Sequence, residues 1–302
     1  MHDKFNSFIS VIIPVFNDSE RLKLCLQALD NQTYPQDLYE VIVVDNASQE
    51  DIKSVTIQFK QTKFCYENQP GSYAARNQGI SVANGDILVF TDSDCIPALD
   101  WIEKGVKSLL SRPNCGLVAG RIDFFFKNPD KPTPVELYES VELPFNQELN
   151  VNNNHFGVTA NLFTFKYVIE KVGSFDDKLK SGGDRQWGEQ VFQAGYTQIY
   201  ADDVCVKHPA RSSFSQLYKR MARFVGGKHD LMMSENPSAL EIFQDIISTF
   251  KPPFRSLYRI WINQEIYGVK QKIKFISVMF FIRYVVVFEK MRLYLGGNSS
   301  RD

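Results

Sequence analysis

The most informative stretch of this 302-residue chain runs from Gly85 to Asp94 and reads GDILVFTDSD. The apolar run 87–90 is typical of a buried β-strand, and two carboxylates separated by one small residue follow it. Open α/β sheets bind their ligands beside the carboxyl ends of the strands. We therefore expect Asp92 and Asp94 at a ligand-binding edge of a sheet.

Two carboxylates at this spacing form a candidate metal site. They repel each other unless a cation or a proton lies between them. Mg²⁺ and Mn²⁺ prefer carboxylate oxygens and keep coordination positions free for substrate phosphates. The alternative is an Asp-rich turn after a strand, because Asp and Ser are common turn formers. A D-x-D pattern alone leaves both interpretations open.

The composition is that of an ordinary globular protein, with 44% hydrophobic and 23% charged residues. The formal net charge of −1 gives no indication of a nucleic-acid partner. An odd number of scattered cysteines without a C-x-x-C pair favours free thiols in a reducing cytoplasm over a disulfide framework or a zinc site. The N-terminal residues lack the basic and apolar regions of a signal peptide, so we expect a cytoplasmic protein. The cysteines are Cys25, Cys65, Cys95, Cys115 and Cys205.

Strand-like and helix-like segments alternate through the first part of the chain, which predicts a parallel-type sheet with right-handed crossovers. Three of the strands end in polar residues, as expected of a nucleotide pocket: Asn17, Asp45, and the pair Asp92 and Asp94. The pattern predicts strands at 8–13, 41–44, 64–66 and 87–90, and helices at about 18–32, 51–60 and 71–83.

The pattern changes after about residue 97. We expect helices at 99–110 and about 185–194, strands at 116–122 and 158–165, a polar loop at 150–155 and a strand pair at 196–206. Beyond about 212 the chain is predicted to be mainly helical. We therefore expect an α/β domain over 1–211 and a helical extension over 212–302.

Five motifs in register resemble family 2 inverting glycosyltransferases of GT-A fold. Each motif is weak alone, but together they cover roughly residues 8–210. The resemblance implies a Rossmann-like, mostly parallel central sheet flanked by helices, and a nucleotide-diphospho-sugar donor. The motifs are VIIPVFN at 11–17, VVDNAS at 43–48, ARNQG at 75–79, DSD at 92–94 and GGDRQW at 182–187.

The resemblance assigns the donor site to the strand ends. Residues 14–17 and Asp45 are expected to line the base and ribose, since a carboxylate can accept from a uracil N3–H or from ribose hydroxyls. Asp45 could instead cap a turn before the next helix. Arg76 could pair with a phosphate or with Asp92, or lie solvated on a helix face. The expected donor-binding residues are Pro14, Phe16, Asn17, Asp45, Arg76, Asp92 and Ser93.

The metal that the resemblance implies, Mn²⁺ or Mg²⁺, is expected on Asp94 with Asp92 nearby. It would neutralise the charge that builds on the leaving diphosphate. His208 is a candidate further ligand, as in some GT-A enzymes, although a lone histidine is often structural. Lys207 and Arg211 would add positive charge near the diphosphate or be surface charges.

Asp184 is the candidate general base, which would take the proton of the acceptor hydroxyl. Many relatives carry Glu-Asp at this turn, whereas this chain has Gly183-Asp184. The alternative is that Asp184 only caps the following helix. Trp187 and Asn161 are candidate residues on the acceptor side. Alternatively, Trp187 belongs to the core and Asn161 is a loop residue without a functional role.

The C-terminal segment is apolar over 275–282 and 284–288, but Arg283 interrupts it and it falls short of a bilayer span. Its aromatic and basic residues suit the interface of an anionic membrane, whereas packing on the catalytic domain or on a second subunit is the alternative. A membrane location would suit a lipid-linked acceptor.

These observations predict a metal-dependent glycosyltransferase that moves a sugar, with inversion, from a UDP-sugar or related donor to a saccharide or lipid-linked acceptor. A role in polysaccharide or cell-envelope synthesis at the inner face of the membrane would follow. A catalytically silent nucleotide-sugar-binding scaffold is one alternative. A sugar-phosphate nucleotidyltransferase is another, but residues 14–17 lack its Gly-rich, Arg-containing loop. A D-x-D motif also serves retaining enzymes.

Overall fold

The computed structural model describes residues 7–234, 236–263, 266 and 268–300. They divide into two compact units. The first holds the chain up to Phe124 with Phe145–Leu179 and Gly183–Pro209, and the second holds Phe125–Pro144, Lys180–Gly182 and the chain from Ala210 on. The ranges 1–211 and 212–302 stay a prediction of where the functional domains lie.

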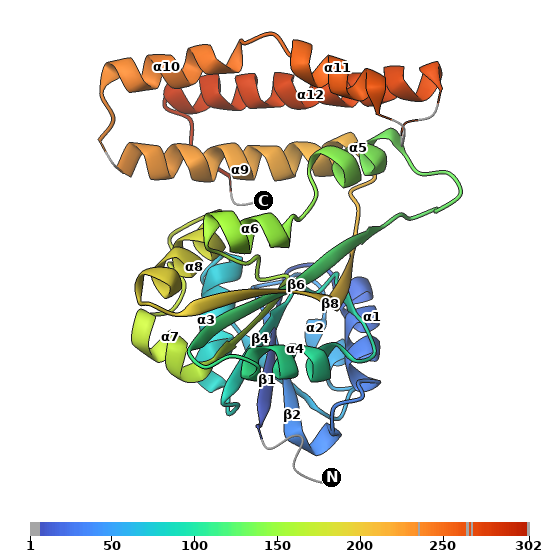
Figure 1. The fold of residues 1–302 in the computed structure, drawn as a ribbon, viewed down its shortest axis with the longest axis vertical. Helices are drawn as coiled ribbons and strands as arrows, with labels where there is room; N and C mark the ends of the chain where they lie inside the picture. The colour runs from blue at the N-terminus through green and yellow to red at the C-terminus, as the bar shows by residue number, and fades with distance from the viewer. Residues whose placement is uncertain (1–6, 235, 264–265, 267, 301–302) are drawn as a thin grey trace. The chain divides into compact units, whose positions relative to one another are not determined.

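One sheet of eight strands runs through the first unit in the order β3-β2-β1-β4-β7-β6-β8-β5 (Figure 1). The first four strands in this order are parallel to one another. Antiparallel pairing begins at β7, which pairs with both β4 and β6, and β5 is antiparallel to β8. The strands are β1 Ile9–Val15, β2 Tyr39–Asp45, β3 Thr62–Tyr66, β4 Ile87–Thr91, β5 Ile96–Pro97, β6 Cys115–Phe125, β7 Asn161–Phe165 and β8 Thr197–Pro209.

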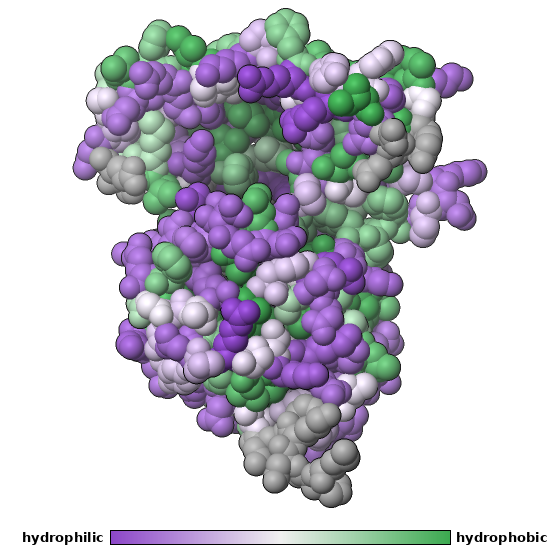
Figure 2. Space-filling model, viewed as in Figure 1, coloured by the Kyte–Doolittle hydropathy of each residue, from purple (hydrophilic) through white to green (hydrophobic). Residues whose placement is uncertain are grey.

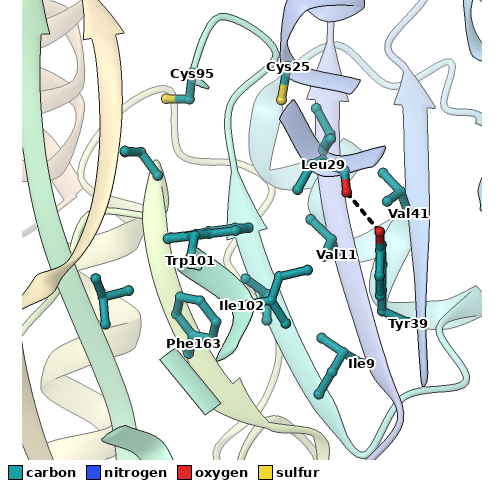
Figure 3. Close-up of a cluster of buried hydrophobic side chains, with 14 of the residues drawn as sticks. Ile9, Val11, Cys25, Leu29, Tyr39, Val41, Cys95, Trp101, Ile102 and Phe163 are labelled. Atoms are coloured by element: carbon teal, nitrogen blue, oxygen red, sulfur yellow. Dashed lines mark hydrogen bonds between the residues drawn. The ribbon is translucent and has the colours of Figure 1, made fainter. Parts of the chain in front are cut away.

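Helices cover both faces of the sheet because successive side chains of a strand point to opposite faces. Val11 and Ile13 of β1 belong to a core cluster with helices α1 and α4, whereas Ile12 belongs to a second cluster with α3 and α8. Figure 3 shows the first cluster, in which the Tyr39 hydroxyl donates to the Leu29 carbonyl at 2.8 Å. The helices of this unit are α1 Ser19–Asp30, α2 Ile52–Thr56, α3 Ser72–Val82, α4 Trp101–Leu110, α6 Gln147–Asn154, α7 Lys166–Val172 and α8 Gly183–Gln193.

Two sequence expectations were wrong in detail. The polar loop expected at 150–155 is the end of helix α6, which closes at His155 with a positive φ of 57°. The expected strand pair at 196–206 is a single strand, β8. Helix α6 has too few apolar residues to show helical periodicity, and it is held instead by the buried Gln147 side chain, which bonds the backbone of Val158.

The second unit is helical, as predicted for the chain beyond 212. It also includes α5, where Thr133 and Glu136 form a capping box ahead of an N-terminal proline. Its core packs Leu217, Phe275 and Val278 together. No described helix is both long enough and apolar enough to cross a membrane. The helices are α5 Pro134–Glu142, α9 Phe214–Ser234, α10 Ala239–Thr249, α11 Phe254–Ile262 and α12 Val269–Tyr294.

Candidate active site

Asp92, Asp94 and His208 lie together at the end of strand β4. The strand stops at Thr91, so both carboxylates follow directly at its carboxyl edge, and β8 carries His208 to the same place. One ligand atom from each of the three residues lies within 4.8 Å of the others. The His208 Nε2 is 3.6 Å from an Asp94 oxygen, while its Nδ1 is 2.9 Å from the Pro209 carbonyl. A carbonyl only accepts, so the Nδ1 proton points there and Nε2 faces the carboxylates.

This cluster has the size and chemistry of a divalent cation site. Ligands of an octahedral ion with bonds of about 2.1 Å lie roughly 3 to 4.2 Å apart, so small movements would seat an ion among the three residues. Two carboxylate oxygens suit Mg²⁺ or Mn²⁺, and the added imidazole nitrogen favours Mn²⁺, because Mg²⁺ takes hard oxygen ligands. The residues present therefore fit the predicted cofactor.

A pair of charged residues beside this cluster was not recognised from the sequence. Arg21 donates to Asp18 at 2.7 Å and to Asp94 at 3.4 Å, and Ser93 donates its hydroxyl proton to the other Asp18 oxygen at 3.3 Å. Burial raises the pKa of Asp18, and the Arg21 guanidinium only partly offsets it. Asp18 occupies the N-cap position of α1, but its side chain makes no cap bond. The Asp-x-x-Arg spacing of Asp18 and Arg21 is the sequence feature that could have indicated this ion pair.

Arg76 is buried on helix α3 and contacts Asp92 at 2.5 Å through Nη2. The helix comes this close to the sheet because Gly79 has no side chain, and a Cβ there would lie 2.5 Å from Ile12 Cγ2. The Arg76 Nε has no hydrogen-bond partner among the described residues. Of the alternatives for Arg76, the structure shows the pairing with Asp92, and the buried Nε of the guanidinium is left without a partner in the described part of the chain.

Asp184 lies in the first turn of α8, surrounded by protein on most sides and open to solvent on part of its surface. Its two oxygens accept from the Thr159 hydroxyl at 3.1 Å and the Thr159 amide at 3.4 Å. It is the second residue of the helix, so it does not occupy the cap position. Burial raises the pKa of its carboxyl, the Arg76 guanidinium opposes this, and Asp92 adds to it.

The turn that carries Asp184 is fixed by Tyr73. The Tyr73 hydroxyl accepts from the Gly183 amide at 2.9 Å and from the Asp184 amide at 3.4 Å. A Cβ on Gly183 would lie 2.7 Å from the Tyr73 ring, so the tyrosine fills the space that a larger residue at 183 would need. The contact with Tyr73 therefore favours glycine at position 183. A tyrosine three residues before Arg76 gave no signal in the sequence.

The ends of β1 and β2 meet at the expected nucleotide pocket. Asn17, with a positive φ of 48°, accepts from the Gln49 amide at 2.7 Å, and its own amide donates to the Ser48 hydroxyl at 2.9 Å. One Asp45 oxygen accepts from the Ser48 amide at 3.0 Å, which is the turn-capping bond of the alternative interpretation. The second oxygen accepts no hydrogen bond from another described residue. Pro14 is buried in β1, whereas Phe16 is 49% exposed and offers a ring for stacking.

Two expected acceptor-side residues lie in the core instead. Asn161 is fully buried, accepting from the Trp101 indole at 2.8 Å and donating to the carbonyls of Arg121 and Val204. Trp187 is 1% exposed and donates to the Gly173 carbonyl. Neither has a polar group or ring face left for an acceptor sugar. Thr159, two residues before Asn161, bonds Asp184 instead.

Comparison with known proteins defines the class. A profile of glycosyl transferase family 2 matches residues 10–173. Glycosyltransferase AglE of Haloferax volcanii is 40% identical over 244 residues, which cover 78% of this chain and 78% of that protein. The chain belongs to glycosyl transferase family 2. It is a glycosyltransferase of the hexosyltransferase type that uses nucleotide-sugar donors.

A second relative acts on a lipid-linked sugar by its name. The dolichyl N-acetyl-α-D-glucosaminyl phosphate 3-β-D-2,3-diacetamido-2,3-dideoxy-β-D-glucuronosyltransferase of Methanococcus voltae is 23% identical over 235 residues, covering 74% of this chain and 73% of that protein. A third, from a different setting, is the chondroitin synthase of Pasteurella multocida, 27% identical over 228 residues, which cover 63% of this chain and 23% of the relative.

Solved structures confirm the GT-A fold. The mannosyltransferase PcManGT of Pyrobaculum calidifontis, in complex with GDP-Man and Mn²⁺, superposes with a TM-score of 0.61 over 97% of this chain and 88% of that one, at 18% identity. GalNAc-T7 with UDP, GalNAc and Mn²⁺ gives a TM-score of 0.55 over 69% of this chain and 45% of that one, at 16% identity. At these identities the likeness concerns the fold.

Proposed function

We propose that this enzyme transfers a sugar from a nucleotide-diphospho-sugar, a UDP-sugar in the first place, to a hydroxyl of a saccharide or lipid-linked acceptor. The reaction depends on Mn²⁺ or Mg²⁺ and inverts the anomeric carbon. The observation that carries the proposal is that Asp92, Asp94 and His208 lie together at the edge of β4. Arg76 contacts Asp92, and both of these residues are near enough to Asp184 to shift the pKa of its carboxyl.

The donor lies along the ends of β1, β2 and β4. Phe16 stacks on the base, and the free oxygen of Asp45 accepts from a uracil N3–H or a ribose hydroxyl. Arg76 holds Asp92 and adds positive charge beside the donor phosphates. Asp92, Asp94 and His208 would hold the cation, which supplies Lewis-acid neutralisation of the leaving diphosphate when bound.

Asp184 acts as general base. It takes the proton from the acceptor hydroxyl as that oxygen forms its bond to the anomeric carbon, and the bond from this carbon to the phosphate oxygen breaks on the opposite side. The nucleoside diphosphate leaves with the bonding electrons. Thr159 and Tyr73 fix the carboxylate for this step, which a general base accelerates by about 10²–10⁴-fold.

We also propose that the enzyme works at the inner, cytoplasmic face of a membrane, in polysaccharide or cell-envelope synthesis. A lipid-linked acceptor is supported by the lipid-linked substrate in the name of the Methanococcus voltae relative. A catalytically silent scaffold is less well supported, because the chain has a carboxylate at the position of the candidate base, Asp184, and side chains that can bind a metal at Asp92, Asp94 and His208. The loop after β1 gives no support to a nucleotidyltransferase.

The test is a transfer assay with UDP- and GDP-sugars, Mn²⁺, and saccharide or polyprenyl-phosphate acceptors. The anomeric configuration of donor and product is read by proton NMR. We expect inversion, and a loss of about 10²–10⁴-fold in turnover for Asp184→Asn. The exposed Asp37→Asn serves as the matched control and should keep wild-type turnover. Retention of configuration, or full activity of Asp184→Asn, would contradict the proposal.

A further inference from the structure

The helices of the second unit expose an unusual number of large apolar side chains. Helix α10 has no buried residue, and α11 buries only Ile260. Their exposed side chains include Phe254 at 73%, Tyr258 at 67% and Trp261 at 57%. Scattered single apolar residues are normal on a protein surface, whereas these recur at three- to four-residue spacing and so lie along one face of each helix, as in an interaction site. The set on α10 and α11 is Leu240, Phe243, Ile247, Phe250, Phe254, Tyr258, Trp261 and Ile262.

Helix α12 adds a stripe of the same kind. Its exposed apolar residues recur every three to four positions, or at twice that interval, so they lie along one face, while a second face packs into the core. In Figure 1, α10 and α11 follow one another along the length of α12. Figure 2 shows hydrophobic side chains interleaved with hydrophilic ones over these helices. The stripe is Val269, Ile273, Phe280, Tyr284, Phe288, Met291 and Leu295.

The charge of this region differs sharply from that of the rest of the chain. Residues 239–294, which span α10 to α12, contain nine basic residues and four acidic residues, a formal charge of +5, whereas the remainder carries −6. A chain that is nearly neutral as a whole therefore concentrates positive charge where it exposes its aromatic residues. The basic residues are Lys251, Arg255, Arg259, Lys270, Lys272, Lys274, Arg283, Lys290 and Arg292.

Part of this basic set has a structural task. Arg283, which interrupts the apolar sequence of α12, donates to the carbonyls of Thr249 and Lys251 at the end of α10. Lys272 bonds the Trp261 carbonyl and lies 5.5 Å from the centre of the Trp261 ring. Lys251, Arg255, Lys270 and Lys274 are exposed to solvent. They flank the apolar side chains as the basic residues of an interfacial helix do.

We propose that α10, α11 and α12 bind the surface of an anionic lipid bilayer, with the exposed aromatic side chains in the headgroup region and the basic residues against lipid phosphates. A second copy of the chain fits this surface poorly, because two helical segments that each carry a formal charge of +5 would repel each other. The proposal deepens the proposed function, since it would bring the enzyme to a lipid-linked acceptor. Its test needs neither donor nor metal, so the two proposals can fail separately.

Trp261 makes the test specific to this surface. The chain has three tryptophans, and Trp101 and Trp187 are fully buried in the first unit, so only Trp261 can meet lipid. Wild-type protein is mixed with phosphatidylcholine vesicles that contain either no phosphatidylglycerol or about 30%, and tryptophan emission is recorded. We expect a blue shift, and quenching by brominated lipid, only with the anionic vesicles, and weakening as salt rises. No shift with anionic vesicles, or an equal shift with neutral ones, would overturn the proposal.

Two variants separate charge from apolar insertion. Lys251→Gln/Arg255→Gln/Arg259→Gln should weaken vesicle binding by about 100-fold in co-sedimentation, since each basic residue near the surface contributes comparably. Phe254→Ser/Tyr258→Ser should reduce it further at high salt. The matched controls are Lys23→Gln/Lys53→Gln/Lys60→Gln and Ile57→Ser, all exposed on the first unit. Equal binding by variants and controls, or a Trp261 shift that follows protein concentration without lipid, would contradict a membrane surface and favour self-association.

Discussion

At the scale of single residues, the site is a group of carboxylates held in place by two arginines. Arg76 lies against Asp92, and Arg21 bridges Asp18 and Asp94. Arginine suits this task because its planar guanidinium stays charged and offers several donors in fixed directions. The two side chains supply positive charge at the place where a bound cation and a diphosphate would meet.

The pH dependence of transfer tests the role of Thr159. Its hydroxyl donates to Asp184 and lowers the pKa of a carboxyl that burial raises. Thr159→Val removes this bond, so the pKa of Asp184 should rise further. A base must be ionised to act, hence the acid limb of kcat/KM should move to higher pH, with a larger loss at pH 5 than at pH 8. Thr33→Val, an exposed control, should leave the limb in place, and an unmoved limb in Thr159→Val would contradict the account.

Sequence patterns identified the residues at strand ends but not the partners of buried polar groups. Asp92, Asp94 and Asp45 could be found because an apolar run shows where each strand stops. The burial of Asn161 and Trp187 could not be foreseen, since it depends on partners such as Trp101 and Gly173 that are distant in the sequence. Tyr73 was missed for the same reason.

At the scale of elements, the second unit contains a buried ionic cluster. Glu139 of α5 is fully buried and bonds Arg211 and Arg220. Burial acts to raise the pKa of Glu139, but the two guanidinium groups and the Arg211 amide hold it below its usual value. Burial also lowers the pKa of Arg220, to about 10. The cluster therefore joins α5 to the start of α9 through ion pairs.

Removing one member of this cluster should be costly. Glu139→Gln removes the buried carboxylate that Arg211 and Arg220 both contact, and we expect a loss of about 3–5 kcal/mol in the free energy of unfolding, measured with urea at pH 7. Because the folded pKa is lowered, the contribution is present above the unfolded pKa of about 4.3 and is lost as the pH falls through the folded value. Glu170→Gln, exposed on α7, should change stability by less than about 0.5 kcal/mol. Equal effects of the two substitutions would contradict this role.

Most elements could be predicted because apolar periodicity reports which face is buried. Helix α6 could not, since its sequence is mostly Asn, Gln and Glu and its stability comes from the Asn146 cap and the Gln147 bonds. The sequence pattern also did not predict that α2 ends at Thr56, because this end depends on hydrogen bonds of the turn around Thr56 and Phe59.

At the scale of the whole molecule, the chain combines a family 2 GT-A unit with a helical unit that exposes apolar and basic side chains. The helical nature of the C-terminal part could be predicted from its pattern. That residues 125–144 belong to the same unit could not, since they are separated from it by more than sixty residues of sequence. Donor and acceptor identity depend on a few hydrogen bonds from separate loops, which no local pattern reports.

The most direct test of the central claim is thermal stabilisation by UDP and GDP, with and without Mn²⁺, on wild type, Asp94→Ala and the exposed control Asp37→Ala. A ligand at about 100 times its dissociation constant adds roughly 2.7 kcal/mol, a shift of several degrees in Tm. We expect one nucleotide to stabilise wild type and Asp37→Ala in a Mn²⁺-dependent way, and Asp94→Ala to lose the Mn²⁺-dependent part. No response to either nucleotide, or an unchanged response in Asp94→Ala, would contradict a metal-assisted donor site at the end of β4.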